Sequence, residues 1–284
     1  MIENESIAEI FLRVSKKYSN NLALFVENRG YTYKKLRKKS LQIAYYLNLN
    51  FKKERTVGIY LERSFLQIAS VIGCLISGKS FIILDEKIPD ERKKYIIKKL
   101  KIKCLISKNN EFEFKIKNLK IVKINNLSEK KEIKLTSIDY YKEDIVYYIF
   151  TSGSTGEPKG VQISNKNLIC FVKNCQKLFK IKSNDRFILI PFLSFDLSVF
   201  PLWVSLLSGA SLFYTTGSDI TYPVNFIKKH KISVYCLVPS QIDILVNYLK
   251  NFNFKNLSVK LSVFCGEPLR YSHVSSWKKI FTNS

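Results

Sequence analysis

At 284 residues the chain is long enough to bury a large core, in one large domain or in two smaller ones. Its 46% hydrophobic and 25% charged residues are typical of a globular protein, and its apolar runs are too short to span a membrane. The formal net charge is +24, but only 8 of the 47 basic residues are arginine and the lysines are scattered, which argues against a nucleic-acid-binding surface.

The six cysteines include no CxxC pair and the chain has only two histidines, so we expect no zinc site or other metal site built from protein ligands. Most of the cysteines lie in apolar segments, as buried reduced thiols do. The chain starts with Met-Ile-Glu-Asn-Glu, which is unlike a signal peptide. These features predict a cytoplasmic protein.

The first third of the chain predicts helices and strands in alternation. Ser6 and Glu9 form a capping box that begins a helix. Residues 21–33 are typical of a β-hairpin that turns at Asn28-Arg29-Gly30, followed by a helix to about residue 49. Further on we expect strands at 57–61, 80–84 and 103–107, a helix at 65–76 capped by Ser64 and ended by Gly78, and a helix to about residue 100 capped by Asp90. This order predicts an α/β fold in which helices pack on mostly parallel sheets.

Residues 109–142 carry the weakest pattern. Apolar and charged residues alternate at 112–116, as in an edge strand, and the lysine-rich run at 129–134 is typical of a solvated loop. We place a domain boundary near 137–143. It divides the chain into an α/β subdomain at 1–140 and a second α/β subdomain at 141–284.

The most informative stretch is TSGSTGEPKG at 151–160. It lies between a predicted buried strand at 145–150 and a short strand at 161–163, and Ser164 or Asn165 can cap the helix that follows, to about residue 180. Glycines let backbone N–H groups approach an anion, hydroxyls add neutral donors, and a lysine adds positive charge, so this loop suits a polyphosphate. The spacing is not that of a Walker A loop, and the flanking strands disfavour a flexible linker. The candidate phosphate-binding residues are Thr151, Ser152, Gly153, Ser154, Thr155, Gly156 and Lys159.

Asp196 is the only charge in a long apolar run. A buried carboxylate is costly unless it is paired. One interpretation is a helix N-cap, with Asp196 accepting from backbone N–H groups at the start of a helix toward Leu207. The other is a counter-ion for a substrate ammonium group, and the residues alone leave both open. Pro201 within this helix predicts a kink or a late start.

The remaining segments predict strands at 211–214, 232–237 and 259–264, a helix at 223–230, and a helix to about residue 250 capped by Ser240. The last strand runs into Cys265-Gly266-Glu267-Pro268-Leu269, at the end of a sheet where open α/β folds bind ligands. His230 and His273 have no partners at catalytic spacing, and we interpret both as surface or helix-end residues.

TSGSTGEPKGV resembles the phosphate loop of the adenylate-forming superfamily, which includes acyl-CoA synthetases, luciferases and amino-acid adenylation domains. Members activate a carboxylic acid with MgATP to an acyl-adenylate, release pyrophosphate, and usually pass the acyl group to a thiol. The resemblance therefore implies ATP and Mg²⁺ as cofactors. Two further segments resemble family motifs more weakly. Residues 31–36 resemble "TYxEL" with Lys35 at the acidic position, and residues 75–85 resemble "LKAGxAYVPLD" without its proline, to which we assign a packing role.

SFDLSV resembles the fourth core motif of amino-acid adenylation domains, in which the aspartate holds the substrate α-amino group. FCGEPL resembles the family turn "GGExL", whose backbone lies against adenosine, which implies Gly266 and Glu267 as adenosine-binding residues. The resemblance thus implies an amino-acid substrate, and two bulky pocket residues favour a small side chain. The implied substrate-binding residues are Asp196, Leu197, Phe200, Cys236, Val263 and Cys265.

KGVQIS, SFDLSV and FCGE together resemble D-alanine–carrier-protein ligases, with nonribosomal peptide synthetase adenylation domains a close second. Both imply a carrier protein with a phosphopantetheine thiol as a partner. The family pattern continues past residue 284 with a "YGPTE" segment, a ribose-binding aspartate, a hinge and a mobile C-terminal domain that carries a catalytic lysine. We therefore expect an incomplete large N-terminal domain, a partial enzyme completed by a longer product or by a separate C-terminal half.

Two alternatives remain open at this point. The chain could be a catalytically inactive nucleotide-binding fragment or interaction module. It could also be an acyl-CoA synthetase fragment, which Asp196 disfavours because acyl-activating relatives usually lack that residue.

Overall fold

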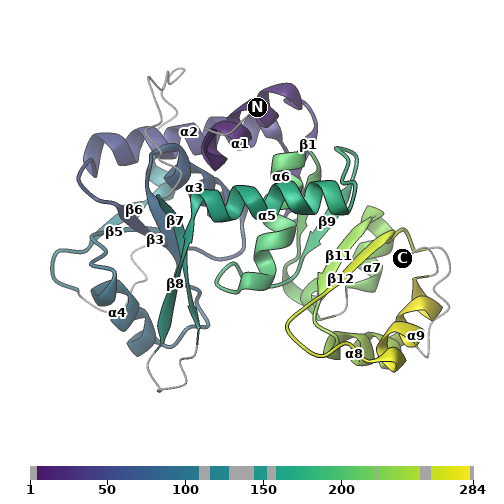
Figure 1. Cartoon of the computed structure of the whole chain (residues 1–284). Helices are drawn as coiled ribbons and strands as arrows, with labels where there is room; N and C mark the ends of the chain where they lie inside the picture. The colour runs from purple at the N-terminus through teal and green to yellow at the C-terminus, as the bar shows by residue number, and fades with distance from the viewer. Residues whose placement is uncertain are drawn as a thin grey trace.

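The computed structural model describes residues 5–108, 116–127, 144–151, 158–221, 223–249 and 257–281 (Figure 1). Its helices are α1 (Ile7–Lys17), α2 (Tyr33–Asn50), α3 (Phe65–Ile76), α4 (Asp90–Lys99), α5 (Asn165–Leu178), α6 (Ser205–Ser208), α7 (Val224–His230), α8 (Ser240–Leu249) and α9 (Tyr271–Ile280). Its strands are β1 (Leu22–Val26), β2 (Arg29–Thr32), β3 (Thr56–Tyr60), β4 (Ser80–Ile83), β5 (Cys104–Ser107), β6 (Lys120–Lys123), β7 (Ile145–Thr151), β8 (Lys159–Ser164), β9 (Arg186–Leu189), β10 (Ser211–Tyr214), β11 (Val234–Leu237) and β12 (Leu261–Phe264).

The described strands form two six-stranded sheets. Sheet A has the order β12-β11-β9-β10-β1-β2, and sheet B has the order β6-β5-β3-β4-β7-β8. Every neighbouring pair is parallel except the hairpins β1–β2 and β7–β8, each of which adds one antiparallel edge strand. The prediction of an α/β fold with mostly parallel sheets is confirmed.

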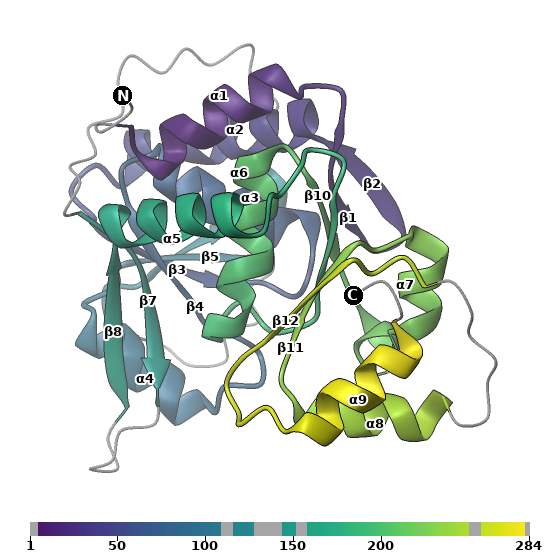
Figure 2. The same ribbon diagram turned by 45° about the vertical axis from the view of Figure 1, so that its right-hand side comes forward.

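Inner strands such as β4 and β9 are nearly continuous apolar runs because both of their faces are covered. In β9, Phe187 and Leu189 face a core between the sheets, while Ile188 between them faces an outer core of sheet A. Sheet B alternates in the same way, with Ile83 facing the shared core and Ile82 facing α4. The result is a layered molecule in which α1, α2, α3, α5 and α6 lie between the sheets, and α7, α8 and α9 lie outside sheet A (Figure 2).

Several helix starts follow the predicted capping chemistry. Ser6 and Glu9 form the predicted capping box of α1, and Ser64 accepts from the Gln67 N–H at the start of α3. Ser164 begins α5 through a reciprocal capping box with Asn167.

Within the described residues, no helix has the length and apolarity that a membrane crossing requires.

Three local predictions were wrong. The first hairpin turns at Glu27-Asn28, which have φ of 52° and 57°, so a two-residue turn with both residues left-handed replaces the predicted turn at 28–30. Asp90 is the first residue of α4 rather than its cap, because Pro89 holds the cap position with no side-chain hydrogen bond. Ser240 was predicted to cap α8 from the position before the helix, but it is itself the first residue of α8.

Some predictions fall outside the described residues. The edge strand at 112–116 lies almost entirely outside them, and so do the loop at 129–134 and the boundary near 137–143. The division at residue 140 stays a prediction. Each sheet contains strands from both sides of it, since β1 and β2 join sheet A and β7 and β8 join sheet B.

Gly209 ends α6 in a conformation that only glycine adopts without strain. Its φ is +76°, and a Cβ built there would lie 2.3 Å from the Tyr18 ring. We expect Gly209→Ala to lower the free energy of unfolding by about 2–4 kcal/mol, from left-handed strain plus overpacking. The matched control is Gly217→Ala, where φ is +57° but no heavy atom lies within 4 Å. Urea unfolding should show a clearly larger loss for Gly209→Ala, and equal losses would contradict the steric part of this prediction.

Candidate active site

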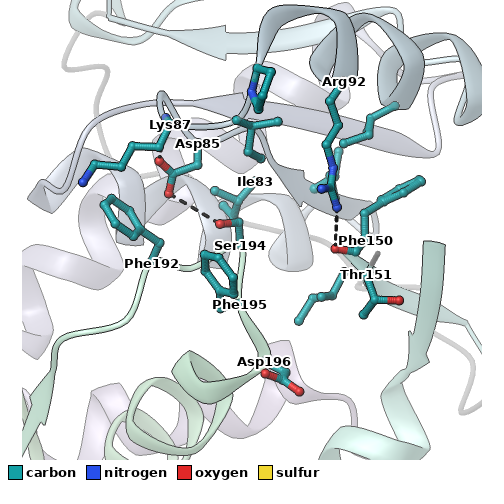
Figure 3. A pocket seen from close by; sticks show the side chains of 15 residues that line it. Ile83, Asp85, Lys87, Arg92, Phe150, Thr151, Phe192, Ser194, Phe195 and Asp196 are labelled. Atoms are coloured by element: carbon teal, nitrogen blue, oxygen red, sulfur yellow. Dashed lines mark hydrogen bonds between the residues drawn. The ribbon is translucent and has the colours of Figure 1, made fainter. Parts of the chain in front are cut away.

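A cavity of about 550 Å³ lies where sheet B meets a loop from sheet A (Figure 3). Because β4 and β7 are parallel neighbours, their carboxyl ends open at the same edge, which is where open α/β sheets bind ligands. The loop that follows β9 in sheet A closes the other side. The lining residues come from these segments and α4: Ile82, Ile83, Asp85, Lys87, Ile88, Pro89, Arg92, Ile96, Ile149, Phe150, Thr151, Phe192, Ser194, Phe195 and Asp196.

The predicted phosphate loop joins β7 to β8 at this edge. Thr151 ends β7, lines the cavity and pairs in register with Lys159, which begins β8. Both residues are exposed. Ser152, Gly153, Ser154, Thr155 and Gly156 lie outside the described residues, so the structure describes only the two ends of the loop.

Asp196 is neither buried nor a helix cap. It is exposed and is itself the first residue of a short 3₁₀ helix, η2 (Asp196–Ser198), for which Phe195 holds the cap position without a side-chain hydrogen bond. A π-helical turn, η3 (Phe200–Val204), follows and contains Pro201. Proline cannot donate a backbone hydrogen bond, which accounts for the irregular helix that its position predicted. The N-cap interpretation of Asp196 is therefore wrong.

The Asp196 carboxylate lies within electrostatic reach of groups from three other segments. Burial raises the pKa of Tyr147 on β7, of Cys236 on β11 and of Cys265 after β12, and the Asp196 charge raises each further. The thiols of Cys236 and Cys265 also influence each other's pKa, since the Cys265 thiol raises that of Cys236 and the Cys236 thiol lowers that of Cys265. Three of the predicted substrate-binding residues, Asp196, Cys236 and Cys265, therefore share one region. Sequence reasoning missed Tyr147, although strand alternation places it on the same face as Thr151.

The other predicted pocket residues lie deeper. Phe200 is 6% exposed, and its ring centre lies 5.8 Å from those of both Phe179 and Phe187, so it packs in the core between the sheets. Leu197 is half-buried against the same core. Val263 is half-buried and pairs in register with Cys236.

The predicted adenosine turn is anchored by its own glutamate. The Glu267 carboxylate accepts from the Ser240 N–H at 2.8 Å and from the Ser240 hydroxyl at 2.9 Å, at the start of α8. A carboxylate is favourable there because the first N–H groups of a helix carry positive partial charge. Gly266 has φ +86°, and both turn residues are exposed. The Glu267 side chain thus binds the start of α8, and the turn at Gly266 and Glu267 is exposed.

Asp85 links the two sides of the cavity. Its carboxylate accepts from the Lys87 N–H at 3.2 Å. It also accepts from the Ser194 hydroxyl at 3.5 Å, and Figure 3 shows this contact beside Phe192. On the opposite wall, Arg92 donates to the Phe150 carbonyl at 3.2 Å. The motif that contains Asp85 was predicted to have a packing role, and its contact with Ser194 joins residues 109 positions apart.

We predict that Asp85→Asn stabilises the protein at neutral pH. Asp85 is 5% exposed, and burial raises its pKa above the ordinary value of 3.8, so the folded state disfavours the charged form. The cost is absent below pH 3.8 and appears as pH rises through the raised pKa. Melting temperatures between pH 4 and pH 8 should separate in favour of the variant as pH rises. A lower melting temperature for Asp85→Asn at pH 7 would contradict this.

The two sheets, the shared helical layer and an edge hairpin whose loop is rich in glycine and hydroxyl residues agree with the adenylate-forming class of α/β domain that the sequence resembles. The chain belongs to the AMP-binding enzyme family, whose model matches residues 11–284. The predicted membership of this superfamily is thereby confirmed.

Known relatives match nearly the whole chain but extend well beyond it. Gramicidin S synthase 2 of Brevibacillus brevis is 28% identical over 272 residues, which is 94% of this chain and 6% of that protein. The nonribosomal peptide synthetase FmoA3, in its α-methyl-L-serine-AMP-bound form, superposes with a TM-score of 0.90 at 18% identity over 98% of this chain and 32% of its own. The Vibrio cholerae adenylation domain AlmE, in complex with glycyl-adenosine-5'-phosphate, gives a TM-score of 0.84 at 23% identity over 96% of this chain and 57% of its own.

Proposed function

We propose that this chain contributes to ATP-dependent activation of an amino acid as an aminoacyl-adenylate. The observation that carries the proposal is Asp196, an exposed carboxylate that caps no helix and lies at the cavity edge with Thr151. A carboxylate in that place suits the ammonium group of an amino acid. In the acyl-CoA synthetase alternative the substrate has no ammonium group, so the Asp196 carboxylate would have no substrate group to bind.

Two of the solved structures that resemble this chain hold adenylates of the same substrate class. FmoA3 and AlmE hold the adenylates of α-methyl-L-serine and glycine, both of which are small amino acids. A small substrate is also our proposal for this chain, although Phe200 and Leu197 pack into the core between the sheets and do not line the cavity. Which amino acid fits is a finer question, since a single methylene discriminates by only about 1–3 kcal/mol.

ATP is proposed to lie between the phosphate loop and the adenosine turn. Thr151 and Lys159 stand at the ends of the loop, where a hydroxyl and an ammonium suit phosphate oxygens. The exposed backbone of Gly266 and Glu267 would face adenosine. The described residues contain no group of three or more His, Cys, Asp or Glu side chains that could hold a metal ion. In this proposal Mg²⁺ would be carried on the substrate phosphates, because Mg²⁺ keeps its waters and needs few protein ligands.

In the proposed reaction a carboxylate oxygen of the amino acid attacks the α-phosphorus of ATP, and the bond to the bridging oxygen of pyrophosphate breaks. Asp196 would hold the ammonium group and so orient the carboxylate, and Lys159 would stabilise charge on the phosphates. A carrier-protein thiol would then attack the acyl carbon and release AMP. The carrier protein, a separate C-terminal half and a cytoplasmic location belong to this proposal, with no nucleic-acid partner.

Amino-acid-dependent exchange of pyrophosphate into ATP tests the proposal on purified 1–284. The panel contains the two enantiomers of alanine first, then glycine and the other protein amino acids. We expect exchange with one small amino acid when the proposed C-terminal half is supplied, and little exchange with 1–284 alone. ATP binding without exchange even in the presence of that half, in a folded protein, would support a nucleotide-binding module instead. Exchange that depends on a fatty or aryl acid would support the acyl-CoA synthetase alternative.

A further inference from the structure

Arg63 lies in the segment that connects strand β3 of sheet B to helix α3, directly before the cap residue of that helix. Its side chain contacts residues that belong to or directly follow strands of sheet A. Its guanidinium carbon is 4.1 Å from the ring centre of Phe192 and 5.1 Å from that of Tyr214, and its Nη1 donates to the Thr215 carbonyl at 3.3 Å. Phe192 and Thr215 follow strands of sheet A, so a single side chain joins the two sheets next to the cavity.

This arginine is held in place by its aromatic neighbours more than by hydrogen bonds. Its Nε and Nη2 are buried and have no hydrogen-bond partner among the described residues. Burial lowers the pKa of Arg63, while Tyr214, Asp85 and Glu86 act in the opposite direction. A buried guanidinium with unused donors is unfavourable. Its stacking on Phe192 offsets part of that cost, because arginine is planar and weakly hydrated.

Phe192 in turn controls the segment that carries Asp196. The Phe195 N–H donates to the Phe192 carbonyl at 3.0 Å, which closes a tight turn directly before Asp196. Two further contacts hold the same turn. The Lys87 ammonium lies 5.1 Å from the Phe192 ring, and the Ser194 hydroxyl donates to Asp85. A shift of Phe192 would therefore move the start of η2 and the carboxylate at its first position.

We propose that Arg63 is a positioning residue that sets the place of Asp196 through the Phe192 turn without touching the substrate. Its consequence for catalysis rests on the proposed function, whereas its effect on the turn does not. Loss of the stacking contact should loosen residues 192–196 and weaken amino-acid binding more than ATP binding.

Amide hydrogen exchange tests the structural part without any need for activity. We expect Arg63→Ala and Phe192→Ala each to speed exchange in the peptide that covers 192–199 by about tenfold, with β1 and β2 unchanged. Arg63→Lys keeps the charge but loses the planar stack, so it should give a smaller change of the same sign. The matched control is Arg186→Ala, whose guanidinium lies 5.9 Å from the Phe213 ring away from the cavity. Unchanged exchange in folded Arg63→Ala and Arg63→Lys would overturn the proposal.

Kinetics test the consequence. With the amino acid that supports exchange in the wild type, Arg63→Ala should raise KM for that amino acid at least tenfold and leave KM for ATP within about twofold. The double variant with Phe192→Ala should be no worse than the poorer single variant, because both act through one contact. Equal rises in both KM values would indicate a general distortion of the cavity and would overturn the positioning role. A wild type without exchange even when the C-terminal half is supplied would contradict the proposed function, and hydrogen exchange would still decide the effect of Arg63.

Discussion

Replacing Asp196 with alanine is expected to abolish amino-acid-dependent pyrophosphate exchange while ATP binding persists. The side chain is exposed at the cavity and forms no helix-capping hydrogen bond, so its removal should cost little stability. Removing one partner of a desolvated charge pair typically costs about 2–5 kcal/mol, which corresponds to a loss of at least about 30-fold in kcat/KM for the amino acid. Exchange kinetics measure that loss, and calorimetric titration with a non-hydrolysable ATP analogue measures nucleotide affinity.

Asp196→Asn separates a counter-ion from a structural role. Asparagine caps helices about as well as aspartate but carries no charge. If Asp196 binds an ammonium group, the asparagine variant should fail nearly as badly as the alanine variant. The matched control is Asp219→Ala, which removes the same charge from within another 3₁₀ helix, η4 (Gly217–Ile220). Loss of ATP binding together with exchange in Asp196→Ala would contradict the counter-ion role.

Local chemistry explains why much of the fold could be predicted. A run such as Phe187-Ile-Leu189 is apolar throughout because its alternate side chains enter two different cores, and this pattern predicts a strand covered on both faces. The start of α1 depends on Ser6 and Glu9, which are only three residues apart, so the sequence alone predicts it. The order of such elements then restricts the architecture to parallel sheets with helices around them.

Pairing between distant segments could not be predicted. The chain places β1 beside β10, with Leu24 opposite Leu212, and nothing in either strand specifies the other. The contact of Asp85 with Ser194 and that of Glu267 with Ser240 have the same origin. Each requires the tertiary fold to bring together two polar groups that look ordinary in their own segments. Sequence motifs could therefore suggest candidate site residues within one segment, but not contacts for which two segments had to meet.

Asp196 illustrates how structure can decide between interpretations. The sequence shows a lone charge in an apolar run, which suggests burial. In the structure the run turns at Phe192–Phe195, and Asp196 emerges at the cavity while its neighbours Leu193 and Phe200 are buried. A lone charge in an apolar segment can therefore mark the point where a buried segment reaches the surface. That placement is consistent with a binding role and leaves a capping role without support.

Lys159→Ala is expected to weaken ATP binding by roughly 10- to 100-fold, because hydrogen bonds to charged groups contribute about 1.5–3 kcal/mol. Lys159 is exposed at the first position of β8, opposite Thr151, so its truncation should leave the hairpin intact. Calorimetric titration with ATP at two salt concentrations measures both the affinity and its electrostatic share, since added salt screens exposed charges.

The control for Lys159 must remove the same charge from the same sheet. Lys120 is suitable, since it is an exposed first residue of β6 at the opposite edge of sheet B. Lys120→Ala should change ATP affinity by less than about twofold, because a charge well beyond the Debye length of about 8 Å is largely screened at physiological salt. If both variants lose affinity equally, the net charge of +24 rather than the loop attracts the nucleotide. If neither variant does, the phosphates lie elsewhere. Only a selective loss in Lys159→Ala, which shrinks as salt is added, supports phosphate binding between β7 and β8.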